Sequence, residues 1–102
     1  MYRARDRVEH EAWLDRIGAA AEELDLSGEA RANATDLFLS RVPEEERSKR
    51  AVAAASLYAG ALLAGEERSQ SAVADAVSAS RLSVQQRWKD LLAAAGFDVP
   101  DW

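Results

Sequence analysis

The chain has 102 residues, with 18 acidic against 13 basic residues and a formal net charge of −5. It contains no cysteine and a single histidine, which excludes disulfides and thiolate metal sites within this sequence. A chain of this length is expected to form one domain, here taken as residues 1–102, around one hydrophobic core.

Charge is unevenly distributed along the chain. Residues 1–46 hold 12 acidic and 6 basic residues, whereas residues 47–102 hold 6 acidic and 7 basic ones. An anionic partner would therefore meet the C-terminal half first. Only Lys49 and Lys89 are lysines, against eleven arginines. This composition is typical of a halophilic protein from a salt-rich cytoplasm, and a GC-rich genome is the alternative explanation.

The first seven residues lack an apolar signal region, so a cytoplasmic protein is expected. The longest apolar run has about fourteen residues, which as a helix would span about 21 Å and could not cross a bilayer of about 30 Å. No membrane association is expected.

Two amphipathic helices are predicted in the acidic half. Apolar spacing places the first from about Arg5 to Leu24, and His10 within it is interpreted as a solvated side chain rather than a catalytic one. The second is predicted from an N-cap at Ser27 to about Arg41. The acidic triplet 44–46 that follows is interpreted as a solvated loop rather than a metal site.

The stretch from Ser48 to Gly65 is predicted to be a buried central helix. From residue 51 to residue 64 it carries no charge, and a helix that is apolar on all sides is covered by others. Ser48 is the expected N-cap, and Gly65 is the expected residue after the C-terminus. Gly60 and many alanines would let neighbouring helices approach closely.

Lys49 and Arg50 lie in the predicted first turn of this helix, where the helix macrodipole disfavours cations. Two explanations remain open at this point. The cations either bind a phosphate group of a partner or pair with the acidic triplet 44–46.

The C-terminal half ends in a short helix, predicted at 70–78, and a longer one, predicted from Leu82 to Ala95 after an N-cap at Ser80. A short helix, a tight turn and a longer helix outline a helix-turn-helix, here residues 68–95. The second helix exposes residue types suited to base edges and phosphates, although an ordinary polar face is the alternative. Residues 97–102 are expected to fold back onto the bundle.

The segment from residue 48 to residue 96 resembles a cyclin-like repeat of archaeal transcription factor B, the counterpart of eukaryotic transcription factor IIB. Three blocks carry the resemblance: Ala-Ala-Ala-Ser-Leu-Tyr-Ala-Gly-Ala-Leu-Leu (53–63), Ser-Gln-Ser-Ala-Val-Ala-Asp-Ala-Val (69–77) and Leu-Ser-Val-Gln-Gln-Arg-Trp-Lys-Asp-Leu-Leu (82–92). The last two are similar to the second repeat of the factor, where the resemblance implies a helix-turn-helix that reads the element beside the TATA box. It also implies an all-α fold, a single five-helix cyclin box with a buried central helix.

The sequence departs from the family in two respects. Factor B has two repeats and a cysteine-rich zinc ribbon, whereas this chain shows one repeat and no cysteine, so a complete initiation factor is not expected. The family pattern implies base contacts from positions 82 and 85; Leu82 keeps the aliphatic residue, but Gln85 replaces an arginine. The DNA target of the family therefore does not carry over. Trp88 occupies the aromatic position of the family, and its helical phase predicts a core residue.

We expect no enzyme, no metal and no cofactor, because the sequence has no arrangement suited to acid–base catalysis and no glycine-rich phosphate loop. The expected function is a small DNA-binding transcription regulator that acts on promoter-region double-stranded DNA. A homodimer or a protein of the transcription machinery is a further expected partner, and a protein-interaction module without DNA binding is the alternative function. The residues expected at bases are Arg81, Leu82, Ser83, Gln85 and Gln86. Those expected at phosphates are Lys49, Arg50, Arg68, Arg87 and Lys89.

The halophilic interpretation predicts that added salt stabilises the fold, because molar salt screens repulsion among the carboxylates. Thermal melts in low and molar potassium chloride measure this effect, and the melting temperature should rise with salt. A melting temperature that stays flat or falls would leave genome composition as the explanation.

Overall fold

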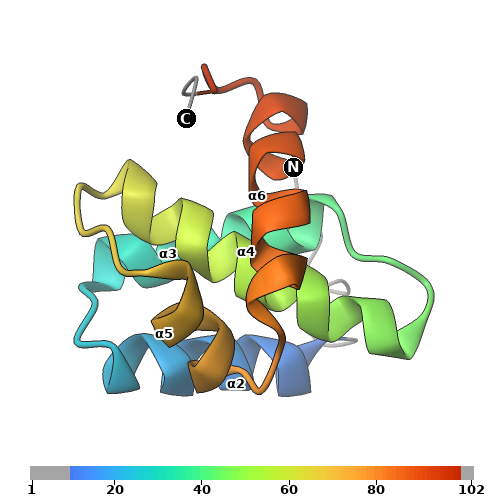
Figure 1. Cartoon of the computed structure of the whole chain (residues 1–102), viewed down its shortest axis with the longest axis horizontal. Helices are drawn as coiled ribbons and strands as arrows, with labels where there is room; N and C mark the ends of the chain where they lie inside the picture. The colour runs from blue at the N-terminus through green and yellow to red at the C-terminus, as the bar shows by residue number, and fades with distance from the viewer. Residues whose placement is uncertain (1–9, 100–102) are drawn as a thin grey trace.

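The computed structural model describes residues 10–99. Within this range the chain forms five helices and no strand: α2 (Glu11–Glu23), α3 (Gly28–Ser40), α4 (Glu46–Leu63), α5 (Gln70–Ala76) and α6 (Arg81–Ala94). The predicted all-α class is confirmed. In Figure 1, α4 crosses the middle of the molecule, α3 lies behind it, α2 lies below, and α5 and α6 lie in front.

The central position of α4 follows from its sequence. Every residue from Ala51 to Ala61 is buried, and α4 contacts each of the other four described helices. Leu57 has no exposed surface, as expected for the middle of a covered helix. No helix among residues 10–99 is both long and apolar enough to span a membrane.

The α3–α4 contact brings the two backbones together at Gly60. A Cβ atom placed on this residue would lie 2.6 Å from the backbone nitrogen of Ala34 and 2.9 Å from its Cα atom. The Asn33 side-chain amide also donates to the carbonyl oxygen of Gly60 at 3.3 Å. The close approach expected from the small residues of α4 is therefore present, and it involves α3.

Local signals set most helix boundaries. The Ser27 hydroxyl accepts from the backbone N–H of Ala30 at 3.2 Å, so the predicted N-cap of α3 is confirmed. At the end of α4, Gly65 has a φ of 74°, and the N–H of Glu66 donates to the carbonyl oxygen of Ala61 at 2.8 Å. These features form the Schellman ending expected from the glycine.

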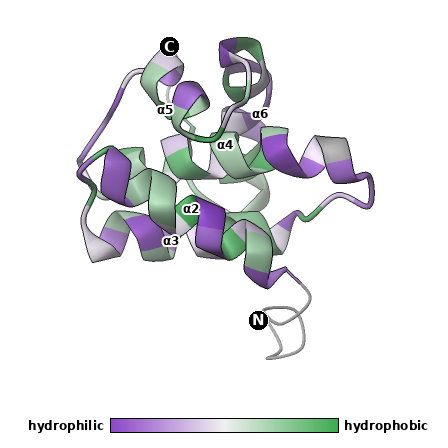
Figure 2. Cartoon of the chain, turned by 90° about the horizontal axis from the view of Figure 1, so that it is seen from below, coloured by the Kyte–Doolittle hydropathy of each residue, from purple (hydrophilic) through white to green (hydrophobic). Residues whose placement is uncertain are grey.

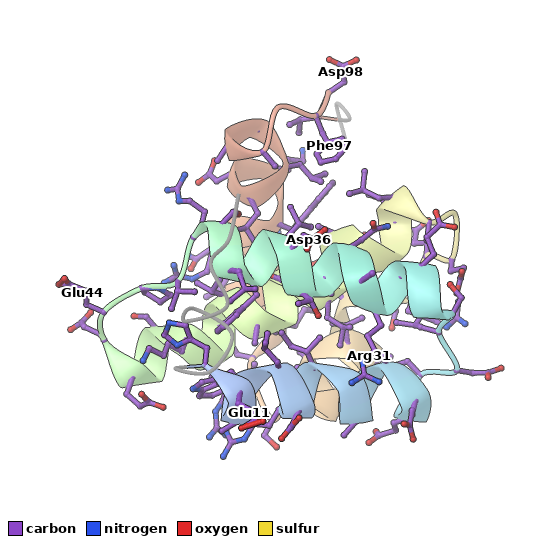
Figure 3. All side chains as sticks on the ribbon, turned by 180° about the vertical axis from the view of Figure 1, so that it is seen from behind. Glu11, Arg31, Asp36, Glu44, Phe97 and Asp98 are labelled. Atoms are coloured by element: carbon purple, nitrogen blue, oxygen red, sulfur yellow. The ribbon has the colours of Figure 1, made fainter. Side chains whose placement is uncertain are left out.

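The start of α4 differs from the prediction. The helix begins at Glu46 rather than after Ser48, and its N-cap, Glu45, makes no side-chain capping bond. The reason is a contact from a distant helix: Trp13 Nε1–H donates to a carboxylate oxygen of Glu46 at 3.0 Å. An acidic residue in the first turn also interacts favourably with the helix macrodipole. Glu44 in the loop before it points into solvent (Figure 3), and Figure 2 shows the end of the loop that leads into α4 as hydrophilic.

The first helix as described begins at Glu11, and the part expected at 5–9 lies outside the described residues. His10 precedes it in a turn and is half-buried rather than freely solvated, because its ring packs edge-on against Phe38 with centroids 6.3 Å apart.

At the other end of the chain, Val99 packs against the core and Phe97 stays 47% exposed. The expected folding back is thus seen only at Val99, and residues 100–102 lie outside the described range.

The Gly60 contact yields a test of the packing. Replacing glycine by alanine inside a helix ordinarily stabilises it by about 0.5–1 kcal/mol. At Gly60 the added methyl group meets backbone atoms that cannot move aside, so Gly60→Ala should instead destabilise the protein by about 1–3 kcal/mol. Chemical denaturation measures the change.

Gly28→Ala is the matched control, because no atom lies within 4 Å of a Cβ atom placed there. This substitution should be neutral or stabilising by up to about 1 kcal/mol. Equal effects of the two substitutions would contradict the backbone contact between α3 and α4.

Candidate nucleic-acid interface

Three serines mark the beginnings of α5 and α6 and the turn between these helices. Ser69 caps α5 by accepting from Ala72 N–H at 3.0 Å, and Ser80 caps α6 by accepting from Ser83 N–H at 3.1 Å. Between them, Ser78 has a φ of 57°, the left-handed conformation in which the chain leaves α5 and turns sharply. The short α5, the tight turn and the capped α6 agree with the predicted helix-turn-helix geometry.

The inner face of α6 fixes how the helix is rotated. Its buried residues are Val84, Trp88, Leu91 and Leu92. The Trp88 ring meets the ring of Tyr58 from α4 edge to face, with centroids 5.2 Å apart, and it is 2% exposed. The prediction that Trp88 belongs to the core is confirmed. Desolvation of the Tyr58 hydroxyl raises its pKa.

The outer face of α6 carries the residues expected at bases. Leu82 is 58% exposed, which is unusual for a leucine beside a core, and Gln85 and Gln86 are exposed three and four residues further on. At this spacing the three side chains share one side of the helix. Lys89 continues the same stripe one turn later, with its Nζ atom 5.6 Å from the Trp88 ring. Figure 1 shows α6 on the front of the molecule.

Two more of the expected base contacts lie at the beginning of α6. Arg81 is its first residue and is exposed. Ser83 is half-buried, and its hydroxyl lies 2.9 Å from that of Ser80 within the helix cap. Arg87 lies on a different side of α6 from the stripe. It is exposed and lines a recess of about 540 Å³ together with His10 and Arg41.

The structure gives Lys49 and Arg50 different surroundings. The sequence left open whether these cations bind a phosphate group or pair with the acidic triplet 44–46. Lys49 Nζ lies 3.2 Å from a carboxylate oxygen of Glu46, which is the pairing with the acidic triplet. The hydrogen bond from Trp13 and then the one from Lys49 lower the pKa of Glu46. Arg50 points elsewhere: its Nη1 atom lies 3.4 Å from the carbonyl oxygen of Ser78, in the turn before α6.

Arg68 has a structural environment that its sequence neighbourhood does not indicate. Its guanidinium donates to four backbone carbonyl oxygens, those of Leu24 and Asp25 in the α2–α3 turn and those of Glu66 and Glu67 in its own loop. Beside it, Glu66 accepts from the N–H and hydroxyl of Ser27, which lowers the Glu66 pKa. Arg68 therefore ties two loops together, and its role at a phosphate stays a prediction.

The structure thus brings together the α6 residues Arg81, Leu82, Ser83, Gln85, Gln86 and Lys89, with Arg50 close to the preceding turn. Lys49, Arg68 and Arg87 lie apart from this group. Arg16 of α2, which the sequence placed in the acidic half and which was expected to have little effect on DNA binding, lies across a recess from Arg50. Helix periodicity placed it on an acidic helix and gave no signal of its neighbour thirty-four residues away.

No group of three or more histidine or acidic side chains in the described range could hold a metal ion. The chain is a helical bundle whose helix α6 presents polar and basic side chains to solvent. Its class follows from comparison with known sequences. The family model described as "Transcription factor TFIIB repeat" matches residues 10–94, a range that takes in all five described helices, and the chain belongs to this family.

Similar proteins agree with this assignment. The chain is 33% identical over 89 residues to transcription initiation factor IIB of Pyrococcus abyssi, covering 84% of this chain and 30% of the relative. It is 32% identical over 88 residues to the protein of the same name from Archaeoglobus fulgidus, covering 83% and 27%. The chain thus spans about 30% of the length of the relatives it matches. They are named as transcription initiation factors rather than enzymes, and the resemblance drawn from the three sequence blocks is confirmed.

Proposed function

We propose that the chain is a DNA-binding transcription regulator in which α6 enters the major groove of promoter-region DNA. The observation that carries this proposal is the exposed stripe of Leu82, Gln85 and Gln86 on a helix that follows a tight turn. Glutamine side chains suit the donor and acceptor pattern of adenine, and an exposed aliphatic group suits the methyl group of thymine.

The local charge supports the same assignment. Helix α6 carries Arg81, Arg87 and Lys89 against a single carboxylate, Asp90. Arg81 and Lys89 lie near the proposed reading face and Arg87 lies on another side of the helix, so these cations can meet phosphates although the net charge of the whole chain is −5. In concentrated salt the repulsion between DNA and the acidic side of the protein extends only a few ångströms, about 3 Å at 1 M ionic strength.

The proposal includes partners beyond DNA. One module of this size covers a short site, and DNA-binding proteins commonly dimerise to double the contact. A homodimer or a protein of the transcription machinery therefore completes the proposed assembly. The relatives carry the name of an initiation factor, which supports this setting. We propose no enzymatic activity for the chain.

Substitutions on α6 separate base reading from phosphate binding. Arg87→Ala and Lys89→Ala should weaken binding to all DNA sequences, and each should lower the slope of log affinity against log salt by about one. Gln85→Ala should instead relax sequence preference, with a loss of roughly 1–3 kcal/mol per missing base contact. Binding to genomic DNA fragments over a range of potassium chloride concentrations measures both effects.

Arg31→Ala is the control for total charge, because Figure 3 shows Arg31 on the side of α2 and α3 that faces away from α5 and α6. This variant should bind like the unmodified protein. Equal binding by all these variants, or no DNA binding at any salt concentration together with recovery of a protein partner, would contradict the proposal. The second result would establish a protein-interaction module instead.

A further inference from the structure

A recess of about 300 Å³ lies beside the turn of the helix-turn-helix. Its walls come from three parts of the chain: α2, the beginning of α4, and the end of α5 with the turn that follows it. The lining residues are Arg16, Ala19, Arg50, Ala76, Val77 and Ser78. In Figure 1 the turn between α5 and α6 lies over α2, and α2 also contacts α5. The recess is thus next to the proposed DNA-reading element without being part of it.

Two guanidinium groups are held at this recess by one aromatic ring. The Cζ atom of Arg16 lies 4.5 Å from the centroid of the Trp13 ring, and that of Arg50 lies 5.9 Å from it. The Trp13 ring is itself 7% exposed and is fixed by its hydrogen bond to Glu46. Cation–π contacts of this kind orient the guanidinium and leave its N–H groups available to an anion.

The two arginines are not neutralised by a carboxylate nearby. Neither forms an ion pair with an acidic residue of the described range, and Glu46, whose pKa Arg16 helps to lower, is already engaged by Trp13 and Lys49. Arg16 is exposed, and besides its contact with the Trp13 ring Arg50 makes one hydrogen bond among the described residues, the 3.4 Å contact with the Ser78 carbonyl oxygen. Placing two like charges on one ring is unfavourable alone, and a bound anion would offset the repulsion.

The position of the recess identifies the anion. Ser78 precedes Arg81, the first residue of α6, by three residues, so at most about 11 Å of chain separates the recess from the reading helix. A helix that enters the major groove brings the flanking sugar–phosphate backbone to the turn before it. A guanidinium binds phosphate oxygens through two parallel N–H···O bonds, and two guanidiniums can hold one group from both sides.

We infer that Arg16 and Arg50 together bind a backbone phosphate of the DNA whose bases α6 reads. The inference rests on the proposed function and deepens it, because it assigns a DNA contact to α2, within the acidic half of the chain. It also pairs Arg50 of α4 with Arg16 of α2 as the second cation that holds the phosphate.

The test uses Arg16→Gln and Arg50→Gln, which remove the charge while keeping side-chain length, with Arg31→Gln as the control for net charge. Each of the first two variants should bind every DNA fragment more weakly and lose about one unit of salt slope. Raising the salt concentration from 50 to 200 mM weakens DNA binding. A variant that lacks one phosphate contact should lose about 3.5-fold less affinity over this range than the unmodified protein. Arg31→Gln should retain the original slope, and circular dichroism should show the same helix content in all three.

Combining the substitutions adds a readout that general misfolding would not produce. If the two guanidiniums hold one phosphate, the double variant should lose less than the sum of the single losses, because the second substitution removes a site already impaired. A parallel titration with inorganic phosphate, followed by the Trp13 indole N–H resonance, reports whether the recess takes a free anion instead.

Three results would overturn the inference. If Arg16→Gln and Arg50→Gln keep full DNA affinity while Arg87→Ala and Lys89→Ala lose it, the recess is not a DNA contact and the proposed function stands. If the unmodified protein binds no DNA, both fail together. If inorganic phosphate shifts the Trp13 resonance but the glutamine variants bind DNA normally, the recess is a site for small anions only.

Discussion

The edge-to-face contact between Trp88 of α6 and Tyr58 of α4 determines which side of the proposed reading helix faces solvent. Successive residues of an α-helix are rotated by about 100°, so burying Trp88 together with Val84 and Leu91 places Leu82 on the outside. Rotating α6 to hide that leucine would expose an indole ring instead, at a cost of several kcal/mol. The proposed base-reading face is therefore a consequence of core packing, which itself depends on the burial of α4.

The distribution of charge gives the small protein two unlike sides. Acidic residues concentrate on α2, α3 and the loop before α4. Two others make contacts within the protein: Glu46 at the start of α4 binds Trp13 and Lys49, and Glu66 after α4 binds Ser27. Basic side chains gather on α6, and Arg50 of α4 lies beside the turn before it. Under the proposed function, an electrostatic gradient of this kind orients the molecule on DNA even though its net charge is negative. Strong salt would weaken the orienting force, and contacts to bases and shape would then contribute more to affinity.

Much of the fold could be predicted because its signals are local. Apolar spacing, serine N-caps and Gly65 located α3, α5, α6 and the end of α4 to within one or two residues, and the uncharged stretch identified the covered helix. The misplaced features depend on distant residues. The start of α4 is set by the contact between Glu46 and Trp13, which lies thirty-three positions earlier. The Arg68 guanidinium donates to carbonyl oxygens of the α2–α3 turn, a contact that helix periodicity does not predict. Likewise, the approach of Arg16 to Arg50 exists only once α2 has packed beneath the turn. Sequence patterns located α6, whereas tertiary contacts decide which cations surround it.

Backbone-amide NMR during titration with a DNA fragment selected from the genome tests the central claim most directly, because it reports contacts residue by residue in the intact chain. The account predicts shifts centred on residues 77–89, covering the turn and the first two-thirds of α6, with the middle of α3 unchanged. Shifts confined to α3 and the α3–α4 loop, or none at saturating DNA, would contradict the assignment of α6 as the reading helix.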